Sequence, residues 1–256
     1  MNALPVEIKN LSFSFTGTKR PVLNNINLRV FPGEIMGIIG LSGCGKTTLA
    51  LGICGLLNKK IVGILKGQVN IFGKSVSDFT LAQIGSKVGL VFQNPDNQLF
   101  STTVFDEIIF GPENLCLQKQ KIQDRAQRSM ELTGIQNLAN RAPGQLSGGE
   151  KYLVAFASVL SLNPDIFIID EVMSQLDFEN VQRVKKIILE LKNAGKSFII
   201  IDHELSRLDI ADKLYLMIDG SLRPATRKDI EEYYKELLSN LDRTFNADTF
   251  EWSERT

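Results

Sequence analysis

The chain has 256 residues, a length that predicts one large domain or one domain with an inserted lobe. Its 29 basic and 29 acidic side chains leave no net charge, which argues against a protein that mainly coats nucleic acid. A hydrophobic content of 43% excludes a disordered chain, and three cysteines without a Cys-x-x-Cys pair favour free thiols in a reducing compartment.

The first part of the chain predicts strands on both sides of a glycine-rich turn. Apolar and polar residues alternate in the first two runs, as in half-buried strands, and the third run is fully apolar, as in a strand buried on both faces. The runs expected to form strands are 6–15, 22–31, 35–39, 69–72 and 88–92. A helix is expected from about 46 to 57.

Residues 97–160 have a different character, because charged helical stretches replace the buried-strand runs. We expect an inserted helical lobe there. Strands return at 166–170, 197–201 and 213–218, and the helix between the first two ends at Gly195. This alternation predicts an α/β core with a mostly parallel sheet.

The two ends of the chain add little chemistry. The N-terminus lacks the basic and apolar regions of a signal peptide, and the apolar runs are far shorter than the roughly 20 residues that cross a bilayer. We therefore expect a soluble chain that can still dock on a membrane protein. Residues 223–256 are expected to form a polar tail with one helix, roughly 228–241.

A phosphate-binding loop is the strongest motif. Residues 40–47 read Gly-Leu-Ser-Gly-Cys-Gly-Lys-Thr and match G-x-x-x-x-G-K-[ST]. In this pattern, backbone N–H groups and a helix N-terminus face phosphate oxygens, the lysine neutralises them, and the hydroxyl can ligate Mg²⁺. The alternative, a glycine-rich turn that only caps a helix, fits poorly with the buried strand before the motif.

An apolar strand at 166–169 ends in two carboxylates, Asp170 and Glu171. Asp170 is expected to hold the Mg²⁺ that Thr47 also contacts, and Glu171 to polarise an attacking water. By itself the pair could be two surface acids at a strand end; the phosphate loop makes the catalytic interpretation the stronger one.

The segment Leu146–Glu150, Leu-Ser-Gly-Gly-Glu, precedes an expected helix at 148–161. Ser147 and Glu150 have the spacing of a capping box, which alone explains them. Gly148 and Gly149, however, weaken the first turn and leave N–H groups uncovered at a positive helix end. This predicts a second anion site.

Together these motifs resemble an ABC-type ATPase over residues 5–222. The stretches Val91–Phe100 and Phe110–Glu113 resemble the ATPase subunits of energy-coupling-factor transporters, which take up vitamins or transition-metal ions. The resemblance implies a P-loop NTPase (RecA-like) core with a mostly parallel sheet, an N-terminal antiparallel β portion and the helical lobe. The nucleotide-binding domain would cover 1–222 and the tail 223–256.

The resemblance also implies the site residues, with ATP and Mg²⁺ as cofactors. Phe15 would stack on adenine, with a core strand residue as the alternative, and Gln93 would contact Mg²⁺ and the attacking water. His203, the single histidine of the chain, would contact the γ-phosphate. ATP would be bound by Phe15, Gly40, Leu41, Ser42, Gly43, Cys44, Gly45, Lys46, Thr47 and Thr48. A second subunit's ATP would be bound by Ser147, Gly148, Gly149, Glu150 and Asp177, and Mg²⁺ by Thr47, Gln93 and Asp170.

Several positions depart from the family's usual residues: Val172 and Met173, Gln175, Asp202, and Tyr152 and Leu153. They argue against full activity of a homodimer, so we expect pairing with a different ATPase subunit, with the homodimer as the alternative. Cys44 lies near a helix N-terminus, where thiol pKa values tend to fall, so we expect a lowered pKa there.

The function implied is an ATPase that powers a membrane uptake transporter from the cytoplasmic face of the cell membrane, without nucleic acid as a partner. The alternative is a soluble ABC-type ATPase with no transporter. The apolar residues expected to grip membrane subunits are Leu99, Phe100, Val104, Phe105, Ile108 and Ile109, for which core packing is the alternative.

Overall fold

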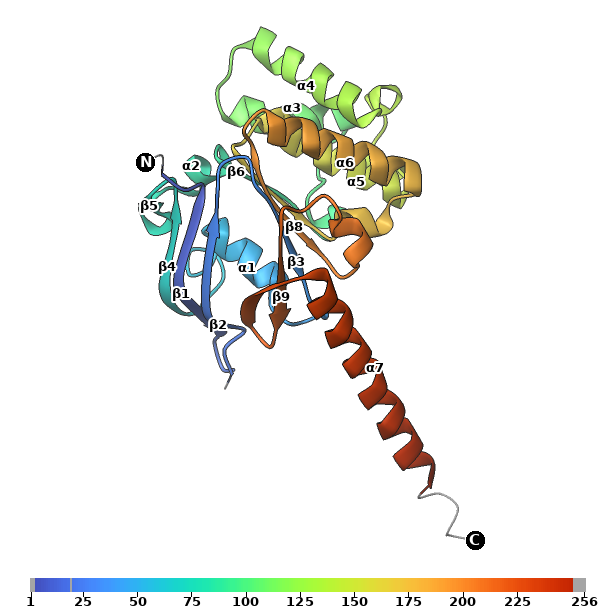
Figure 1. Cartoon of the computed structure of the whole chain (residues 1–256). Helices are drawn as coiled ribbons and strands as arrows, with labels where there is room; N and C mark the ends of the chain where they lie inside the picture. The colour runs from blue at the N-terminus through green and yellow to red at the C-terminus, as the bar shows by residue number, and fades with distance from the viewer. Residues whose placement is uncertain (1–2, 19, 251–256) are drawn as a thin grey trace.

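The computed structural model describes residues 3–18 and 20–250 and contains two β-sheets with helices between and beside them (Figure 1). The smaller sheet is antiparallel and has the order β2-β1-β4-β5. Its strands are β1 (Val6–Phe15), β2 (Leu23–Val30), β4 (Gly63–Ile71) and β5 (Lys74–Ser75). It is the N-terminal antiparallel portion expected from the resemblance.

The larger sheet has the order β10-β9-β3-β8-β7-β6, and all neighbours except β9 and β10 pair in parallel. Its strands are β3 (Ile35–Ile39), β6 (Val88–Val91), β7 (Ile166–Asp170), β8 (Ser197–Asp202), β9 (Lys213–Ile218) and β10 (Ser221–Ala225). Every residue of β3, β7 and β8 is buried, as their apolar sequences predict. The α/β fold class with a mostly parallel sheet is confirmed.

One hydrophobic cluster joins the two sheets through α1 (Lys46–Ile53). It contains Leu11 of the smaller sheet, Ile38 of the larger sheet and Leu49 of α1, all fully buried. α1 ends at Ile53 instead of continuing to 57, because the chain turns at Gly55, whose φ is +67°. Core packing thus fixes the helix that follows the phosphate loop.

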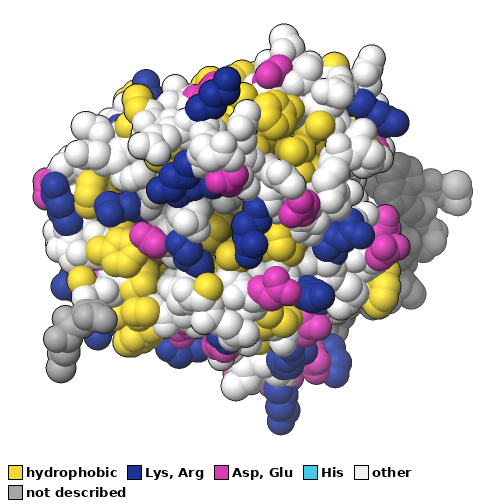
Figure 2. All heavy atoms as spheres, turned by 90° about the horizontal axis from the view of Figure 1, so that it is seen from above, with side chains coloured by type: hydrophobic (Ala, Val, Ile, Leu, Met, Phe, Trp, Pro, Cys, Tyr) yellow, Lys and Arg dark blue, Asp and Glu magenta, His cyan; other side chains and the backbone are white. Residues whose placement is uncertain are grey.

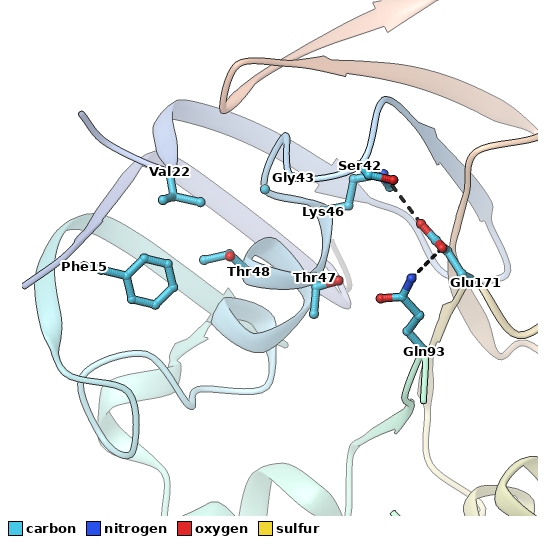
Figure 3. Close-up of a pocket in the computed structure, with 10 residues that line it drawn as sticks. Phe15, Val22, Ser42, Gly43, Lys46, Thr47, Thr48, Gln93 and Glu171 are labelled. Atoms are coloured by element: carbon cyan, nitrogen blue, oxygen red, sulfur yellow. Dashed lines mark hydrogen bonds and ion pairs between the residues drawn. The ribbon is translucent and has the colours of Figure 1, made fainter. Parts of the chain in front are cut away.

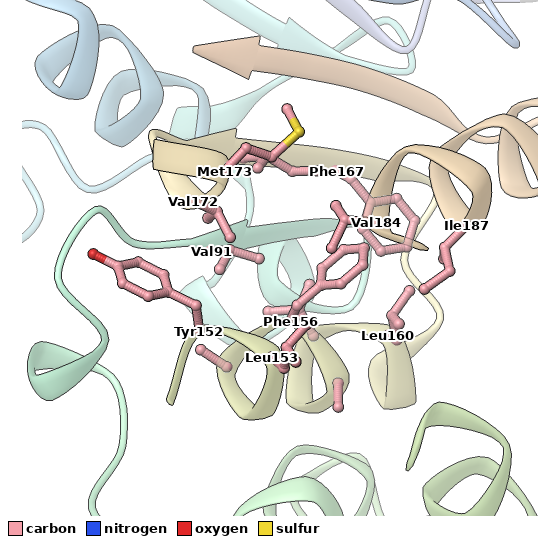
Figure 4. Close-up of a cluster of buried hydrophobic side chains, with 14 of the residues drawn as sticks. Val91, Tyr152, Leu153, Phe156, Leu160, Phe167, Val172, Met173, Val184 and Ile187 are labelled. Atoms are coloured by element: carbon pink, nitrogen blue, oxygen red, sulfur yellow. The ribbon is translucent and has the colours of Figure 1, made fainter. Parts of the chain in front are cut away.

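The other face of the larger sheet is covered by helices α5 (Gly148–Leu162) and α6 (Phe178–Asn193). Helices α3 (Val104–Asn114) and α4 (Lys119–Thr133) pack on α5. Figure 4 shows part of this second cluster, in which α5 and α6 side chains meet those of the sheet. The rings of Phe167 and Phe198 stack there with their centroids 4.9 Å apart. The region 97–160 is therefore largely helical, as expected.

The C-terminal part differs from the sequence expectation. The predicted domain boundary at residue 222 falls inside β10, and the tail helix is α7 (Arg227–Phe250), longer than 228–241. α7 extends away from the body of the molecule (Figure 1). The short helix α2 (Leu81–Gly85) was also not predicted. No helix within the described part of the chain is long and apolar enough to span a membrane.

Candidate functional site

The phosphate loop links β3 to α1 in a backbone path that requires glycine at several positions. Gly43 and Gly45 have φ of +79° and +111°, which side chains rarely tolerate. A Cβ at Gly40 would lie 2.4 Å from the carbonyl oxygen of Met217. The turn after β9 also supports the loop, because the Gly220 N–H donates to the Cys44 carbonyl at 3.0 Å.

Lys46 begins α1 and is only 5% exposed. Its Nζ donates to the carbonyl oxygens of Gly40 at 2.8 Å and Leu41 at 3.0 Å, and it lies 3.6 Å from Oε1 of Glu171. The ammonium group therefore sits between the loop backbone and the carboxylate at the end of β7, where a phosphate group could replace its backbone acceptors.

Asp170 and Thr47 meet as the sequence predicts. The Thr47 hydroxyl donates to Oδ2 of Asp170 at 2.7 Å. Asp170 is 1% exposed, and its Oδ1 has no hydrogen-bond partner among the described residues. Burial, above all, raises the pKa of Asp170 to about 6. A buried carboxylate oxygen without a partner beside a hydroxyl fits a Mg²⁺ ion as the missing neighbour.

Glu171 is held from three sides. Gln93 Nε2 donates to its Oε2 at 2.7 Å, Lys46 lies 3.6 Å from its Oε1, and His203 Nδ1 lies 3.7 Å from its Oε2. The last distance is too long for a hydrogen bond. Its backbone has a left-handed φ of +54°, and its N–H donates to the carbonyl of Ile201. The carboxylate is thus fixed at the edge of the phosphate loop.

Lys46, Thr47, Gln93 and Glu171 line a pocket of about 310 Å³ (Figure 3), whereas Asp170 and His203 are not among its lining residues. Phe15 of β1 lies at one end and Glu171 and Gln93 at the other, with Thr47 and Thr48 between them. The Phe15 ring is 38% exposed and packs edge-on against Phe13, so it is not a core residue. Val22, just before β2, also lines the pocket. An isolated aliphatic residue there carries no sequence signal for a binding role.

The residues expected to act on a second subunit's ATP lie outside this pocket: Ser147, Gly148, Gly149, Glu150 and Asp177. The capping box is present, with Ser147 N–H donating to Glu150 and Glu150 N–H donating back to Ser147. A Cβ added at Gly148 would meet nothing within 4 Å. Packing within the chain therefore does not require glycine there. Asp177 is exposed and caps α6.

Four of the unusual residues, Val172, Met173, Asp202 and Tyr152, have structural roles within the chain. Val172 and Met173 are each 1% exposed in the second hydrophobic cluster. Asp202 is fully buried and accepts from the N–H groups of His203 and Glu204, so it fixes the turn that carries the histidine. The Tyr152 hydroxyl donates to the carbonyl oxygen of Gln93.

The expectation for Cys44 was wrong. Its thiol is half-buried against the first hydrophobic cluster, and burial raises its pKa instead of lowering it. Lys46 acts in the opposite direction with a smaller effect. The helix N-terminus does not compensate for the lost hydration of the thiolate.

The six apolar residues expected at a partner surface divide into two groups. Val104 and Ile108 are fully buried, and Leu99, Phe105 and Ile109 are partly buried against the same core. Phe100, in contrast, is 66% exposed and packs edge-on against Phe110, which is 45% exposed. We call Phe100 and Phe110 the aromatic patch.

Comparison with known proteins gives the family. The family model described as "ABC transporter" matches residues 23–174, more than half of the chain. The chain belongs to the ABC transporter family. The motifs described above are thus those of an ABC-type ATPase cassette.

Individual ABC proteins resemble the chain to different extents. A Treponema denticola protein named as an ABC transporter ATP-binding protein is 39% identical over 85% of this chain and 45% of its own length. The energy-coupling factor transporter ATP-binding protein EcfA1 of Oenococcus oeni is 36% identical over 93% of this chain and 84% of its own. The chain spans about half the length of several curated relatives that it matches.

The solved structure of cbiO1 from Clostridium perfringens, described as part of the ABC transporter complex cbiONQ, has the same fold. It superposes with a TM-score of 0.75 and 27% identity, and the match covers 96% of this chain and 95% of that one. The two sheets and the helices described above are therefore those of an ABC cassette.

Proposed function

We propose that the chain hydrolyses ATP to power a membrane uptake transporter of the energy-coupling-factor type. The observation that carries ATP hydrolysis is the position of Glu171, fixed by Gln93 at the edge of the phosphate-loop pocket. The energy-coupling-factor assignment is supported by the similarity to EcfA1 proteins. The membrane subunit would select the cargo, a vitamin or a transition-metal ion.

Within this proposal the residues in and beside the pocket have separate tasks. The loop N–H groups and Lys46 bind the phosphates, while Phe15 stacks on the adenine ring. Thr47, Asp170 and Gln93 would hold Mg²⁺, which would supply positive charge beside the phosphates. Glu171 accepts a proton from the attacking water, and His203 reaches the γ-phosphate from the end of β8.

A second ATPase subunit, different from this chain, would complete each site. The supporting observation is that a Cβ added at Gly148 would meet nothing within 4 Å, and one at Gly149 would make only ordinary contacts, at the N-terminus of α5 outside the chain's own pocket. A phosphate of the partner's ATP fits the positive end of that helix. Asp177 would cross the same interface. Two unequal sites would result, as expected from the unusual residues of this chain.

The membrane subunit would contact the aromatic patch at the cytoplasmic face of the membrane. Phe100 lies in the segment that follows Gln93, and the N–H groups of Phe100 and Ser101 both donate to the buried Glu107 carboxylate at 2.9 Å. On the face in Figure 2, basic and acidic side chains are interspersed with apolar ones. Such a mixed surface suits a protein partner better than nucleic acid.

Co-purification from detergent-solubilised membranes tests the transporter. We expect the tagged chain to retain a polytopic membrane protein and a second ATPase, and the Phe100→Asp, Phe110→Asp double variant to lose the membrane protein. Phe31→Asp is the matched control, because Phe31 is also an exposed phenylalanine (46%) but directly follows β2, outside the aromatic patch. ATPase activity without any retained membrane partner would favour the alternative, an ABC-type ATPase not attached to a transporter.

A further inference from the structure

The segment after β6 is fastened to the first turns of α5 by three side-chain contacts. The Tyr152 hydroxyl donates to the Gln93 carbonyl oxygen, and Lys151 Nζ lies 2.6 Å from Oδ1 of Asp96. Gln98 Nε2 donates to the Ala155 carbonyl at 3.4 Å, a weaker contact. The hydroxyl bond depends on a tyrosine at position 152, one of the positions that depart from the family's usual residues.

The burial of the Tyr152 ring orients its hydroxyl for the bond to Gln93. The residue is 7% exposed, and its ring lies at the edge of the second hydrophobic cluster with the hydroxyl directed out of it (Figure 4). Burial raises the pKa of the hydroxyl, so it keeps its proton at neutral pH and remains a donor. The ring position leaves the oxygen little freedom, and the bond therefore fixes the Gln93 backbone relative to α5.

Gln93 is bonded at both of its ends. Its carbonyl accepts from Tyr152, and its side-chain amide donates to Glu171 at 2.7 Å. A continuous chain of contacts thus runs from the N-terminal turns of α5, through Tyr152 and Gln93, to the carboxylate beside the phosphate loop. A shift of α5 relative to the sheet would pull the Gln93 backbone and change the contact to Glu171.

We propose that Tyr152 is a positioning residue that couples the start of α5 to Gln93 and thereby holds Glu171 in place for hydrolysis. The inference rests on ATP hydrolysis by this chain and is independent of the transporter type. Tyr152 is not among the residues that line the pocket; it acts through Gln93. The Lys151–Asp96 ion pair supports the same link from the solvent side.

The first test is Tyr152→Phe, which removes the hydroxyl and keeps the ring. In the full-length chain, purified with the subunits that give it ATPase activity, we expect turnover to fall about three- to tenfold because one hydrogen bond is lost. The KM for ATP should stay within about twofold, since the binding groups are untouched. Tyr234→Phe is the matched control, because the Tyr234 hydroxyl is buried without a hydrogen-bond partner among the described residues.

A double-mutant cycle separates positioning from general loosening of the core. In a Gln93→Ala background, the route from Tyr152 to Glu171 is already cut, so Tyr152→Phe should cause no further loss of turnover in single-turnover assays. An equal loss in both backgrounds would overturn the proposal, and so would unchanged turnover of Tyr152→Phe alone.

Asp96→Asn probes the same link without touching the core, because the Asp96 side chain is 64% exposed. We expect a loss of about twofold, small because exposed ion pairs contribute little. If Tyr152→Phe does not fold, unchanged turnover of Asp96→Asn overturns the proposal. Absent turnover of the wild-type assembly contradicts the proposed function itself, whereas wild-type turnover that both variants retain contradicts only this inference.

Discussion

Glu171 combines a strained backbone with a carboxylate that faces Gln93, Lys46 and His203. Its φ of +54° is unusual for a glutamate, and Gln93 and Lys46 both face its carboxylate. Glu171→Gln keeps the size and removes the base, so turnover should fall roughly hundredfold or more while ATP still binds. Phosphate release and binding of a fluorescent ATP analogue measure the two properties. Normal hydrolysis by this variant would show that another group is the base.

A change at Lys46 should affect ATP binding itself, whereas Glu171→Gln should affect only turnover. The buried ammonium group faces the phosphate loop, so Lys46→Ala removes a charge that binds the phosphates. We expect ATP binding itself to weaken by about tenfold or more. Equilibrium titration with the same fluorescent analogue measures this, and unaltered affinity would contradict the assignment of Lys46.

Asp170 gives the nucleotide-free, Mg²⁺-free protein a pH-dependent stability. Burial raises its folded pKa to about 6, above the ordinary value of 3.8. Stability from this group is therefore fully present below about pH 4 and is lost as the pH rises to about 6, because the unfolded chain ionises first. The loss is about 3 kcal/mol.

Urea denaturation in EDTA, compared between wild type and Asp170→Asn at several pH values, isolates this group from the other titrating residues. The difference between the two free energies of unfolding should change between pH 4 and 6 and stay constant above about pH 7. A constant difference throughout would mean that the Asp170 carboxyl is not perturbed by burial.

The cysteines should differ in reactivity. Burial raises the pKa of Cys44 and raises that of Cys54 to about 12, whereas Cys116 is exposed. Iodoacetamide at pH 8 should therefore modify Cys116 first, as mass spectrometry of the peptides would show. In a Cys116→Ser variant, alkylation should become slow overall. Cys44 reacting fastest would restore the original expectation of an activated thiol.

At the scale of elements, α3 stabilises the loop that presents the aromatic patch. Glu107 is 4% exposed, and its Oε2 accepts from two backbone N–H groups of that loop, each at 2.9 Å. Glu107→Ala leaves both donors without an acceptor, so the free energy of unfolding should fall by about 2–3 kcal/mol. Glu107→Gln keeps an acceptor oxygen and should cost less. Urea denaturation distinguishes the two, and equal stabilities would rule out this role for the carboxylate.

Elements with strong local patterns were predictable, and elements fixed by distant partners were not. The apolar runs of β3, β7 and β8 predict buried strands. β4 begins earlier than expected, at Gly63, because its largely exposed first half pairs with β1 across the antiparallel sheet. β10 was assigned partly to the tail, since its pairing with β9 depends on a turn at Asp219 and Gly220.

The candidate site likewise has parts that local spacing predicts and parts that only distant contacts fix. The phosphate loop, Asp170 and Glu171 follow from spacing, because parallel strands end at one edge of the sheet. The bond between Tyr152 and Gln93 joins residues 59 positions apart, and no local pattern indicates it. Cys44 shows the opposite error: its local position suggested a low pKa, but packing against the core decides its hydration.

At the scale of the molecule, the larger sheet is shared by two hydrophobic clusters. One cluster ties it to α1 and the smaller sheet, and the other ties it to α3, α5 and α6. The carboxyl ends of β3, β7 and β8 deliver the phosphate loop, Glu171 and His203 to one edge. A displacement of the helices relative to the smaller sheet would therefore change the geometry of that edge, where the pocket lies (Figure 3).

The turn between β9 and β10 connects the phosphate loop to the solvent-exposed surface through hydrogen bonds. The Gly220 N–H bonds the Cys44 carbonyl in the phosphate loop, and the Gly220 carbonyl accepts from the Asn24 N–H at 2.8 Å. The neighbouring Ser221 is exposed to solvent. A spin label or fluorophore attached at Ser221 would thus serve as a reporter of loop occupancy, at a position that blocks neither the pocket nor the aromatic patch.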